Sequence, residues 1–388
     1  MGKSIERTYD DRRENGKSRS ILTWAALIIL MIFYMGTWTF PLFYHYTEKF
    51  NTLIVFVSLG MLFLAHVDII EKLKSREPQF IVLAATLVLA AVNLFIIGSN
   101  KGCILILANF LIIWYLAPFV KFDSRQQKAL EVFFLIMFAS WFVYDRAFSY
   151  NSNTGATVTV FTFLGAMILL TKLTAKKEIY GFFIVLASIR VVTLVLWHLA
   201  RGAFIAFALY MTFYYIVPKK WWSGRKRYLA LTLFATFGSI GFVIFYVALA
   251  STGFNMQLPF FYKSIFSGRE QIWLEVWDIL KNNILTGIGS GRQLKSFVEY
   301  NMHNAMYDIL AVHGLPVFLL SMYLIVSRLR LLQTGLENMD KIRICAAAAI
   351  FAIFIESFID MDLMWADYSP LLIFLTTTAF SGREESNG

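Results

Sequence analysis

Residues 21–43 read ILTWAALIILMIFYMGTWTFPLF, an uncharged apolar run long enough to cross a bilayer as a helix. The whole chain of 388 residues is 58% hydrophobic and only 15% charged, which is not the composition of a soluble domain. The runs are continuous and do not alternate, so a β-barrel is excluded. We predict an all-α, polytopic integral membrane protein with about twelve transmembrane helices, at residues 21–43, 51–70, 79–97, 102–120, 130–148, 156–172, 179–198, 202–217, 229–250, 304–327, 342–360 and 369–382.

The distribution of positive charge predicts how the chain lies in the membrane. Residues 1–388 are expected to form a single integral membrane domain, and residues 251–303 are its only substantial loop. Most of the 35 Lys and Arg residues fall in the tail 1–20 and in every second connection, which is the positive-inside pattern. We therefore expect both termini in the cytoplasm and the loop 251–303 outside. The net charge of +10 follows from this topology, so no nucleic-acid partner is predicted.

The loop 251–303 contains one helical pattern. Ile272, Val276 and Ile279 share a face of residues 270–281, whereas Glu270 and Asp278 are polar. This pattern is typical of an amphipathic helix on a membrane surface. The segment before it is irregular, and the glycines after it end the helix.

Three side chains with chemical potential are expected on the outer side. Arg201 follows an apolar span, Arg269 begins the amphipathic helix, and His303 lies where the loop re-enters the membrane. An Arg at a helix start is unfavourable for the helix dipole, and a bound anion would compensate for it. Each residue alone has an ordinary explanation as an interfacial side chain. Their joint occurrence favours a functional site.

The same residues carry a resemblance to a known family. Arg201-Gly202-Ala203 after an apolar span, Ser267-Gly268-Arg269-x-x-x-Trp273, a Gly-x-Gly at 287–289, and His303-Asn304-x9-Gly314 resemble the O-antigen ligase and polymerase family of bacterial envelope glycosyltransferases. The resemblance covers residues ~195–320. It implies transfer of a glycan from an undecaprenyl pyrophosphate carrier to a sugar hydroxyl, with inversion and without a metal or other cofactor.

The resemblance also implies roles for individual residues. Arg201 and Arg269 would bind the pyrophosphate, because guanidinium groups bind phosphate oxygens bidentately. His303 would take the acceptor proton as general base or orient the acceptor. We predict these three as catalytic residues, and as substrate-binding residues we predict Asn304, Arg190, Trp273, Arg292 and Asp362.

The sequence leaves the roles of Arg190, within a span, and of the outward-facing Asp360 and Asp362 open. Arg190 could reach the pyrophosphate or pair with Glu356 or Asp145. Asp360-Met361-Asp362 is a D-x-D sequence, which holds a metal in nucleotide-sugar transferases. Nucleotide sugars are cytoplasmic whereas this sequence is expected outside, so contact with the glycan is favoured over metal binding.

The reaction is expected to be polymerisation of surface polysaccharide repeat units, in O-antigen, capsule or exopolysaccharide. Val317 stands where the ligase pattern has Gly, Thr or Tyr, which favours a polymerase over a ligase that attaches polymer to lipid A-core. A flippase or transporter is the alternative of another class, and a structural subunit would leave the three catalytic candidates unexplained. Expected partners are the lipid-linked glycan, an acceptor glycan or glycolipid, membrane lipids and envelope polysaccharide assembly proteins. The expected location is the bacterial plasma (inner) membrane, with the active site on the periplasmic or extracellular side.

Overall fold

A computed structural model describes residues 2–100, 102–143, 150–254, 256–258, 261–291, 294–295, 302–336 and 340–381, with the backbone alone at 2–16, 263 and 335. Its elements in the first half are α1 (Gly2–Thr39), α2 (Pro41–Thr47), α3 (Asn51–His66), α4 (Ile69–Lys74), α5 (Pro78–Ile97), α6 (Gly102–Leu116), α7 (Ser124–Val143), α8 (Ser152–Lys176) and α9 (Tyr180–Trp197). The second half comprises α10 (Arg201–Met211), the π-helical turn η2 (Thr212–Ile216), α11 (Lys219–Trp222), α12 (Arg225–Ser251), β1 (Gln257–Leu258), β2 (Lys263–Ser264), α13 (Arg269–Leu280), α14 (Ala305–His313), α15 (Leu315–Leu336), α16 (Lys341–Glu356), the 3-10 turn η3 (Ala366–Tyr368) and α17 (Ser369–Phe380).

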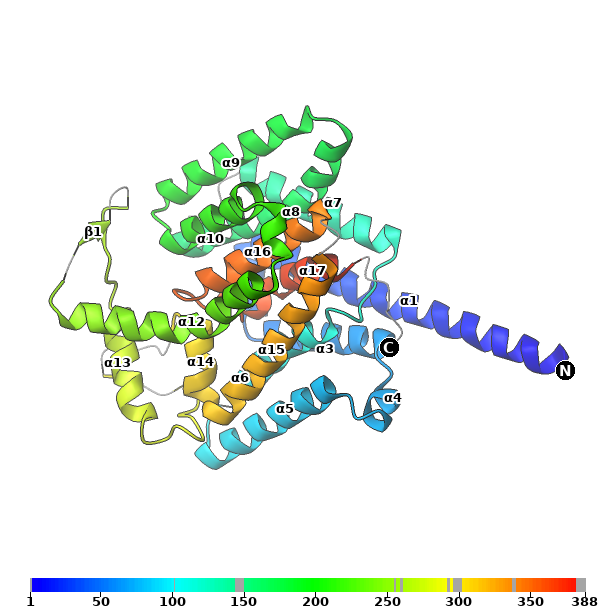
Figure 1. The fold of residues 1–388 in the computed structure, drawn as a ribbon, viewed down its shortest axis with the longest axis horizontal. Coiled ribbons are helices and arrows are strands. Elements are labelled where there is room, and N and C mark those ends of the chain that lie inside the picture. The colour runs from blue at the N-terminus through cyan, green and yellow to red at the C-terminus, as the bar shows by residue number, and fades with distance from the viewer. Residues whose placement is uncertain are drawn as a thin grey trace.

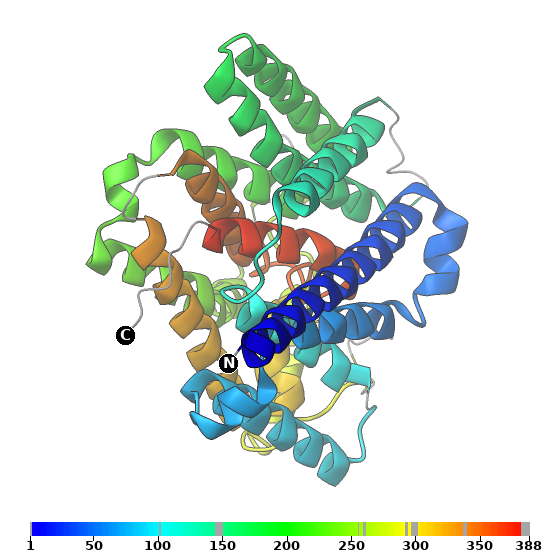
Figure 2. The ribbon, with the colours of Figure 1, turned by 90° about the vertical axis from the view of Figure 1, so that its right-hand side faces the viewer.

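The interior of the bundle is formed by α8, α16 and α17, whose side chains are buried along almost their whole length. Figure 2 shows α17 (red) near the centre, with other helices around it. Four consecutive alanines at 346–349 in α16 allow neighbouring helices to approach closely. The outer helices α5 and α9 instead expose large apolar side chains, such as Phe95 and Phe182. An apolar exterior of this kind is expected of a protein surrounded by lipid.

The structure confirms an all-α membrane architecture. Within the described residues, six helices are long and apolar enough to cross a membrane, or seven if α2 and α3, which meet at a 78° bend, form one span. Each of the twelve predicted segments contains helix, but the number of membrane crossings stays a prediction. The only β structure among the described residues is the antiparallel pair β1 and β2 in the loop.

Three predicted boundaries are wrong. The first run ends at Thr39, because Pro41 begins a separate short helix. The predicted span 304–327 is two helices, α14 and α15, which break at Gly314. The predicted span 342–360 ends as a helix at Glu356, so Asp360 lies in the segment that follows.

The break at Gly314 has a steric cause. Gly314 has φ +84°, and a Cβ there would lie 2.3 Å from the carbonyl oxygen of Leu285. The loop residues fill the gap, since the Ile284 carbonyl accepts the N–H of Leu315 at 2.8 Å and Ile288 N–H donates to Ala311 at 2.7 Å. Gly287 is equally confined, with its Cβ position 2.5 Å from Val312 O. The Gly-x-Gly sequence therefore docks the loop onto α14.

The helix ends gather at two opposite ends of the bundle. The first turns of α8 and the starts of α10 and α13 line one pocket, whereas the last turns of α8 and α17 and the start of α16 line cavities at the other end. In Figure 1, β1 and α13 lie on the left and the N-terminal end of α1 on the right. Which of these ends faces the cytoplasm stays a prediction from the charge pattern.

Candidate active site

A polar pocket of about 40 Å³ lies at the end of the bundle that carries α13. Four separate parts of the chain form it: the start of α8, the turn between α9 and α10, the start of α13 and the segment after α16. The pocket is lined by Asn153, Thr157, Leu199, Ala200, Arg201, Gly202, Ala203, Arg269 and Asp360. Arg201 and Arg269, predicted from the sequence, thus meet at one place although they are far apart in the chain.

Arg201 is the first residue of α10 and is held by the loop. Its Nη1 donates to the carbonyl oxygens of Ser264 at 2.6 Å and Ile265 at 3.2 Å. The hydroxyl of Tyr246 donates to the same Ile265 carbonyl at 2.7 Å. Burial lowers the pKa of Arg201, and the positive charge of Arg269 lowers it further. Two neighbouring guanidinium groups that repel each other favour an anion between them.

Asp360 joins Arg269 to His303. Its Oδ2 lies 3.9 Å from Nη2 of Arg269, and its Oδ1 lies 3.6 Å from Nδ1 of His303. Burial alone would raise the pKa of Asp360, but the contacts with His303 and Arg269 outweigh burial and lower it. The carboxylate therefore stays ionised between the two groups and compensates the unfavourable position of Arg269 at a helix start.

His303 stands in an unusual backbone conformation. It has φ +47°, and Leu199 in the pocket has φ +53°, so both occupy the left-handed region that non-glycine residues rarely adopt. Such conformations persist where the surroundings hold them and are frequent at functional sites. The residues on both sides of His303 supply that support.

Trp273 and Asn304 hold the backbone on either side of His303, and their predicted contact with substrate stays a prediction. Trp273 is 1% exposed, and its indole N–H donates to the Met302 carbonyl at 2.6 Å. Asn304 is fully buried and is the N-cap of α14, where Oδ1 accepts from the N–H of Tyr307 and from the hydroxyl of Ser239. Its amide nitrogen donates to the Phe358 carbonyl. Both side chains hold the backbone around His303 through these hydrogen bonds.

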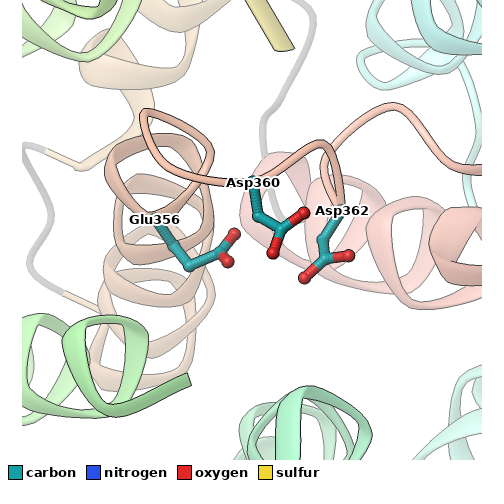
Figure 3. A group of neighbouring side chains, drawn as sticks. All are labelled: Glu356, Asp360 and Asp362. Carbon is teal, nitrogen blue, oxygen red and sulfur yellow. The ribbon is translucent and has the colours of Figure 1, made fainter. Parts of the chain in front are cut away.

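Three carboxyl groups converge beside this pocket, as Figure 3 shows for Glu356, Asp360 and Asp362. One oxygen atom from each of the three lies within 4.8 Å of the other two. No described residue donates a hydrogen bond to either carboxyl oxygen of Glu356, which is fully buried. Burial, and then the charge of Asp360, raise the pKa of Asp362. A group of this kind can accept hydrogen bonds from sugar hydroxyls or hold a cation.

Glu356 also explains the glycine after Arg201. A Cβ on Gly202 would lie 2.9 Å from Oε1 of Glu356, so the small residue lets α10 and α16 meet at the site. The sequence placed Glu356 within a span as a possible partner of Arg190. The structure instead places the Glu356 carboxyl group beside those of Asp360 and Asp362.

Arg190 and Arg292 are the remaining predicted residues. Arg190 does not line the pocket, and its Nε donates to the Phe142 carbonyl at 3.1 Å, close to the end of α7. It forms no ion pair with Glu356. Arg292 and Asp145 lie outside the described residues, so their predicted roles stay predictions.

The residues on the other side of the pocket could not be recognised from the sequence. Asn153 and Thr157 are polar residues at the start of a helix, a position with many ordinary explanations. Asp360 was visible only as half of a D-x-D sequence. Its link to both Arg269 and His303 depends on a contact between segments more than fifty residues apart, which no local pattern reveals.

Comparison with known proteins locates a family in the second half of the chain. The O-antigen ligase family model matches residues 181–322. The match includes Arg201, Arg269 and His303, and it confirms the resemblance seen in the sequence motifs. Glu356, Asp360 and Asp362 lie beyond the matched region. No curated protein and no solved structure matches the chain.

Proposed function

We propose that this membrane protein, whose residues 181–322 belong to the O-antigen ligase family, transfers a glycan from a polyprenyl pyrophosphate to a sugar hydroxyl at the Arg201–Arg269 pocket. The family match indicates glycosyltransferase activity of the O-antigen ligase and polymerase type. The proposed donor and mechanism rest on one observation: the guanidinium groups of Arg201 and Arg269 line the same pocket, and Asp360 links His303 to Arg269.

The reaction breaks the bond between the anomeric carbon and the pyrophosphate oxygen. Arg201 and Arg269 hold the pyrophosphate and stabilise the charge that develops on it as this bond breaks. The acceptor oxygen forms its bond to the anomeric carbon from the opposite face, so the configuration inverts. The products are the extended glycan and the free polyprenyl pyrophosphate.

The acceptor proton needs a base, and His303 is the base in this proposal. Asp360 faces Nδ1, so it favours the tautomer with the proton on that nitrogen and leaves the lone pair on Nε2. The proton from the acceptor hydroxyl passes to Nε2, and Asp360 then stabilises the positive imidazolium. Asp362 and Glu356 lie beside this pair, where they can accept hydrogen bonds from the acceptor sugar.

The product is proposed to be a surface polysaccharide, formed by joining lipid-linked repeat units. Val317, at the position where the ligase pattern has Gly, Thr or Tyr, favours a polymerase. Transfer of finished polymer to lipid A-core, as in a ligase, uses the same donor and the same pocket. The proposed arrangement has twelve spans, cytoplasmic termini and the pocket on the outer side of the inner membrane.

The central test replaces Arg269 and His303 with alanine, one at a time, in a strain that lacks the chromosomal gene. We expect each variant to lose glycan transfer by about 10²-fold or more, since one general base or one anion-stabilising donor contributes this much. Matched controls are Arg330→Ala and His45→Ala, which change the same residue types at exposed positions away from the pocket. A gel of surface glycans and the amount of inserted protein are the measurements.

The same gel separates the two transfer reactions. A single repeat unit on the lipid anchor indicates a missing polymerase, and bare core with carrier-linked polymer indicates a missing ligase. Full transfer by both alanine variants would remove the catalytic assignment.

A further inference from the structure

A second cavity, of about 280 Å³, lies at the other end of the helices that form the candidate active site. Its wall is built by the last turns of α8, the start of α9, the π-helical turn η2, the start of α11 and the start of α16. The residues that line the cavity include Thr171, Tyr214, Tyr215, Lys219 and Lys341.

The cavity is well separated from the transfer site. Thr157 in the active-site pocket and Thr171 in this cavity are both on α8, and a helix rises 1.5 Å per residue, so they are roughly 20 Å apart along the axis. Helices α10 with η2, and α16, run between the same two places, and the three helices pack against one another. A distance of this size corresponds to most of the hydrocarbon thickness of a bilayer, so the cavity faces the opposite leaflet.

The chemistry of the wall is cationic. Lys219 and Lys341 come from segments far apart in the sequence, and neither forms an ion pair with a described residue. No described residue that lines the cavity is acidic. The hydroxyl groups of Thr171 and Tyr214 on the same wall are hydrogen-bonded to each other at 3.2 Å, and that of Thr171 also donates to Cys345 Sγ at 3.7 Å. The two ammonium groups are therefore the donors that suit the oxygen atoms of a phosphate.

The mouth of the cavity is apolar. Tyr215 lines it and is 50% exposed, and the next residue, Ile216, is 73% exposed. Ile184 adds a further apolar side chain to the wall. A free phosphate ion gains nothing from this surface, whereas the acyl chains of a lipid bury it.

We propose that this cavity binds the headgroup of an anionic phospholipid, with the phosphate between Lys219 and Lys341 and the acyl chains over Tyr215 and Ile216. The positive-inside rule accounts for lysines anywhere at the cytoplasmic end of the bundle. It does not account for two lysines from distant segments that line one cavity. Basic pockets between helices on the cytoplasmic side are where anionic lipid headgroups bind in other membrane proteins.

The experiment titrates phosphatidylglycerol into the purified full-length protein in detergent and counts bound lipids by native mass spectrometry. We expect one tightly retained phosphatidylglycerol and weaker binding of phosphatidylcholine with the same acyl chains. The double variant Lys219→Gln/Lys341→Gln is expected to bind phosphatidylglycerol about 30-fold more weakly, since each lysine near a lipid phosphate contributes about 1 kcal/mol.

The control is Lys220→Gln/Lys226→Gln, which removes the same charge from exposed positions in the same basic segment but outside the cavity. It is expected to retain the lipid. A second variant, Ala175→Trp, fills the cavity without a change of charge and is expected to lose the lipid as well. The melting temperature of each variant shows whether it is folded.

Three results would overturn the proposal. Equal weakening in the cavity and control variants would show attraction to surface charge alone. Equal binding of phosphatidylcholine would show that the negative headgroup is not recognised. Displacement of the lipid by millimolar inorganic phosphate would show that the site recognises phosphate alone and not a lipid.

Discussion

Arg269 begins α13 directly after Gly268, which has φ +88° and allows the sharp entry into the helix. A positive side chain at a helix N-terminus is destabilising unless an anion lies close by. In this structure that anion is Asp360, at 3.9 Å. The distance is longer than a direct hydrogen bond, so the guanidinium keeps donors for a second anion. The pyrophosphate of the proposed donor would occupy them.

The first prediction at this scale concerns the shape of the Arg269 side chain. Arg269→Lys keeps the charge but loses the planar fork that binds two phosphate oxygens at once. We expect at least a tenfold decrease in glycan transfer, measured with a lipid-linked donor in detergent. Arg330→Lys, on an exposed position, is the control. Transfer by Arg269→Lys at the original rate would mean that charge alone is required.

The second prediction concerns metal removal from the cluster of three carboxylates formed by Glu356, Asp360 and Asp362. These three could hold a divalent cation by their spacing, although Arg269 already neutralises one of them. Because two arginines supply the positive charge that the leaving pyrophosphate needs, we expect unchanged transfer after dialysis against EDTA. A loss of more than tenfold that Mg²⁺ or Mn²⁺ restores would assign a cation to these carboxylates instead.

The sequence singles out charged residues that stand in unusual places, and for two of them the structure shows that they meet. Arg201 and Arg269 were chosen as positive groups at membrane boundaries, and the structure brings them to one pocket. The backbone contacts of Trp273 and Asn304 could not be predicted in the same way, because the sequence does not distinguish an indole or an amide that contacts a ligand from one that contacts the backbone. Their burial and their bonds to Met302 and Phe358 could not be inferred from local patterns.

At the scale of elements, the break between α14 and α15 decides where His303 lies. Nine residues of α14 rise only about 14 Å, so this helix cannot cross a bilayer by itself. Gly314 and the loop residues around Gly287 fill the space beside the break. The apolar pattern at 304–327 is continuous, and hydropathy cannot detect a break that is caused by backbone contact with a distant loop.

The corresponding prediction is that Gly287→Ala is much more destabilising than Gly253→Ala. Both glycines have positive φ, which costs an alanine about 1–2 kcal/mol at either position. Only Gly287 has neighbours that a Cβ would strike, at 2.5 Å, whereas nothing lies within 4 Å at Gly253. Overpacking adds a further 1–3 kcal/mol or so. Thermal unfolding in detergent measures the difference, and equal melting temperatures would show that the loop does not dock on α14 as described.

For the whole molecule, the sequence predicted the helical membrane architecture, because it follows from composition. The number of crossings could not be predicted with the same force. Helices such as α16 and α17 are buried in protein along their length, and a buried helix and a membrane-spanning helix have the same apolar composition.

The orientation of the whole molecule in the membrane is the fourth prediction. A reporter fused near residue 285 is expected to be active outside the cytoplasm, because the basic segments lie at the other end of the bundle. A reporter near residue 223, within the basic segment 219–227, is the opposite control and is expected to be cytoplasmic. An inverted pair of signals would overturn the topology and, with it, the outer location of the pocket.

Asp360 contacts Arg269 with one oxygen and His303 with the other. The two oxygens belong to one rigid, planar group, so rotation about a single side-chain bond moves both contacts at once. A turn of this one carboxylate therefore changes its contact with the guanidinium and its contact with the imidazole together. A shift of the segment after α16 would couple the two groups in the same way, so in the proposed reaction it would affect both the hold on the diphosphate and the transfer of the proton.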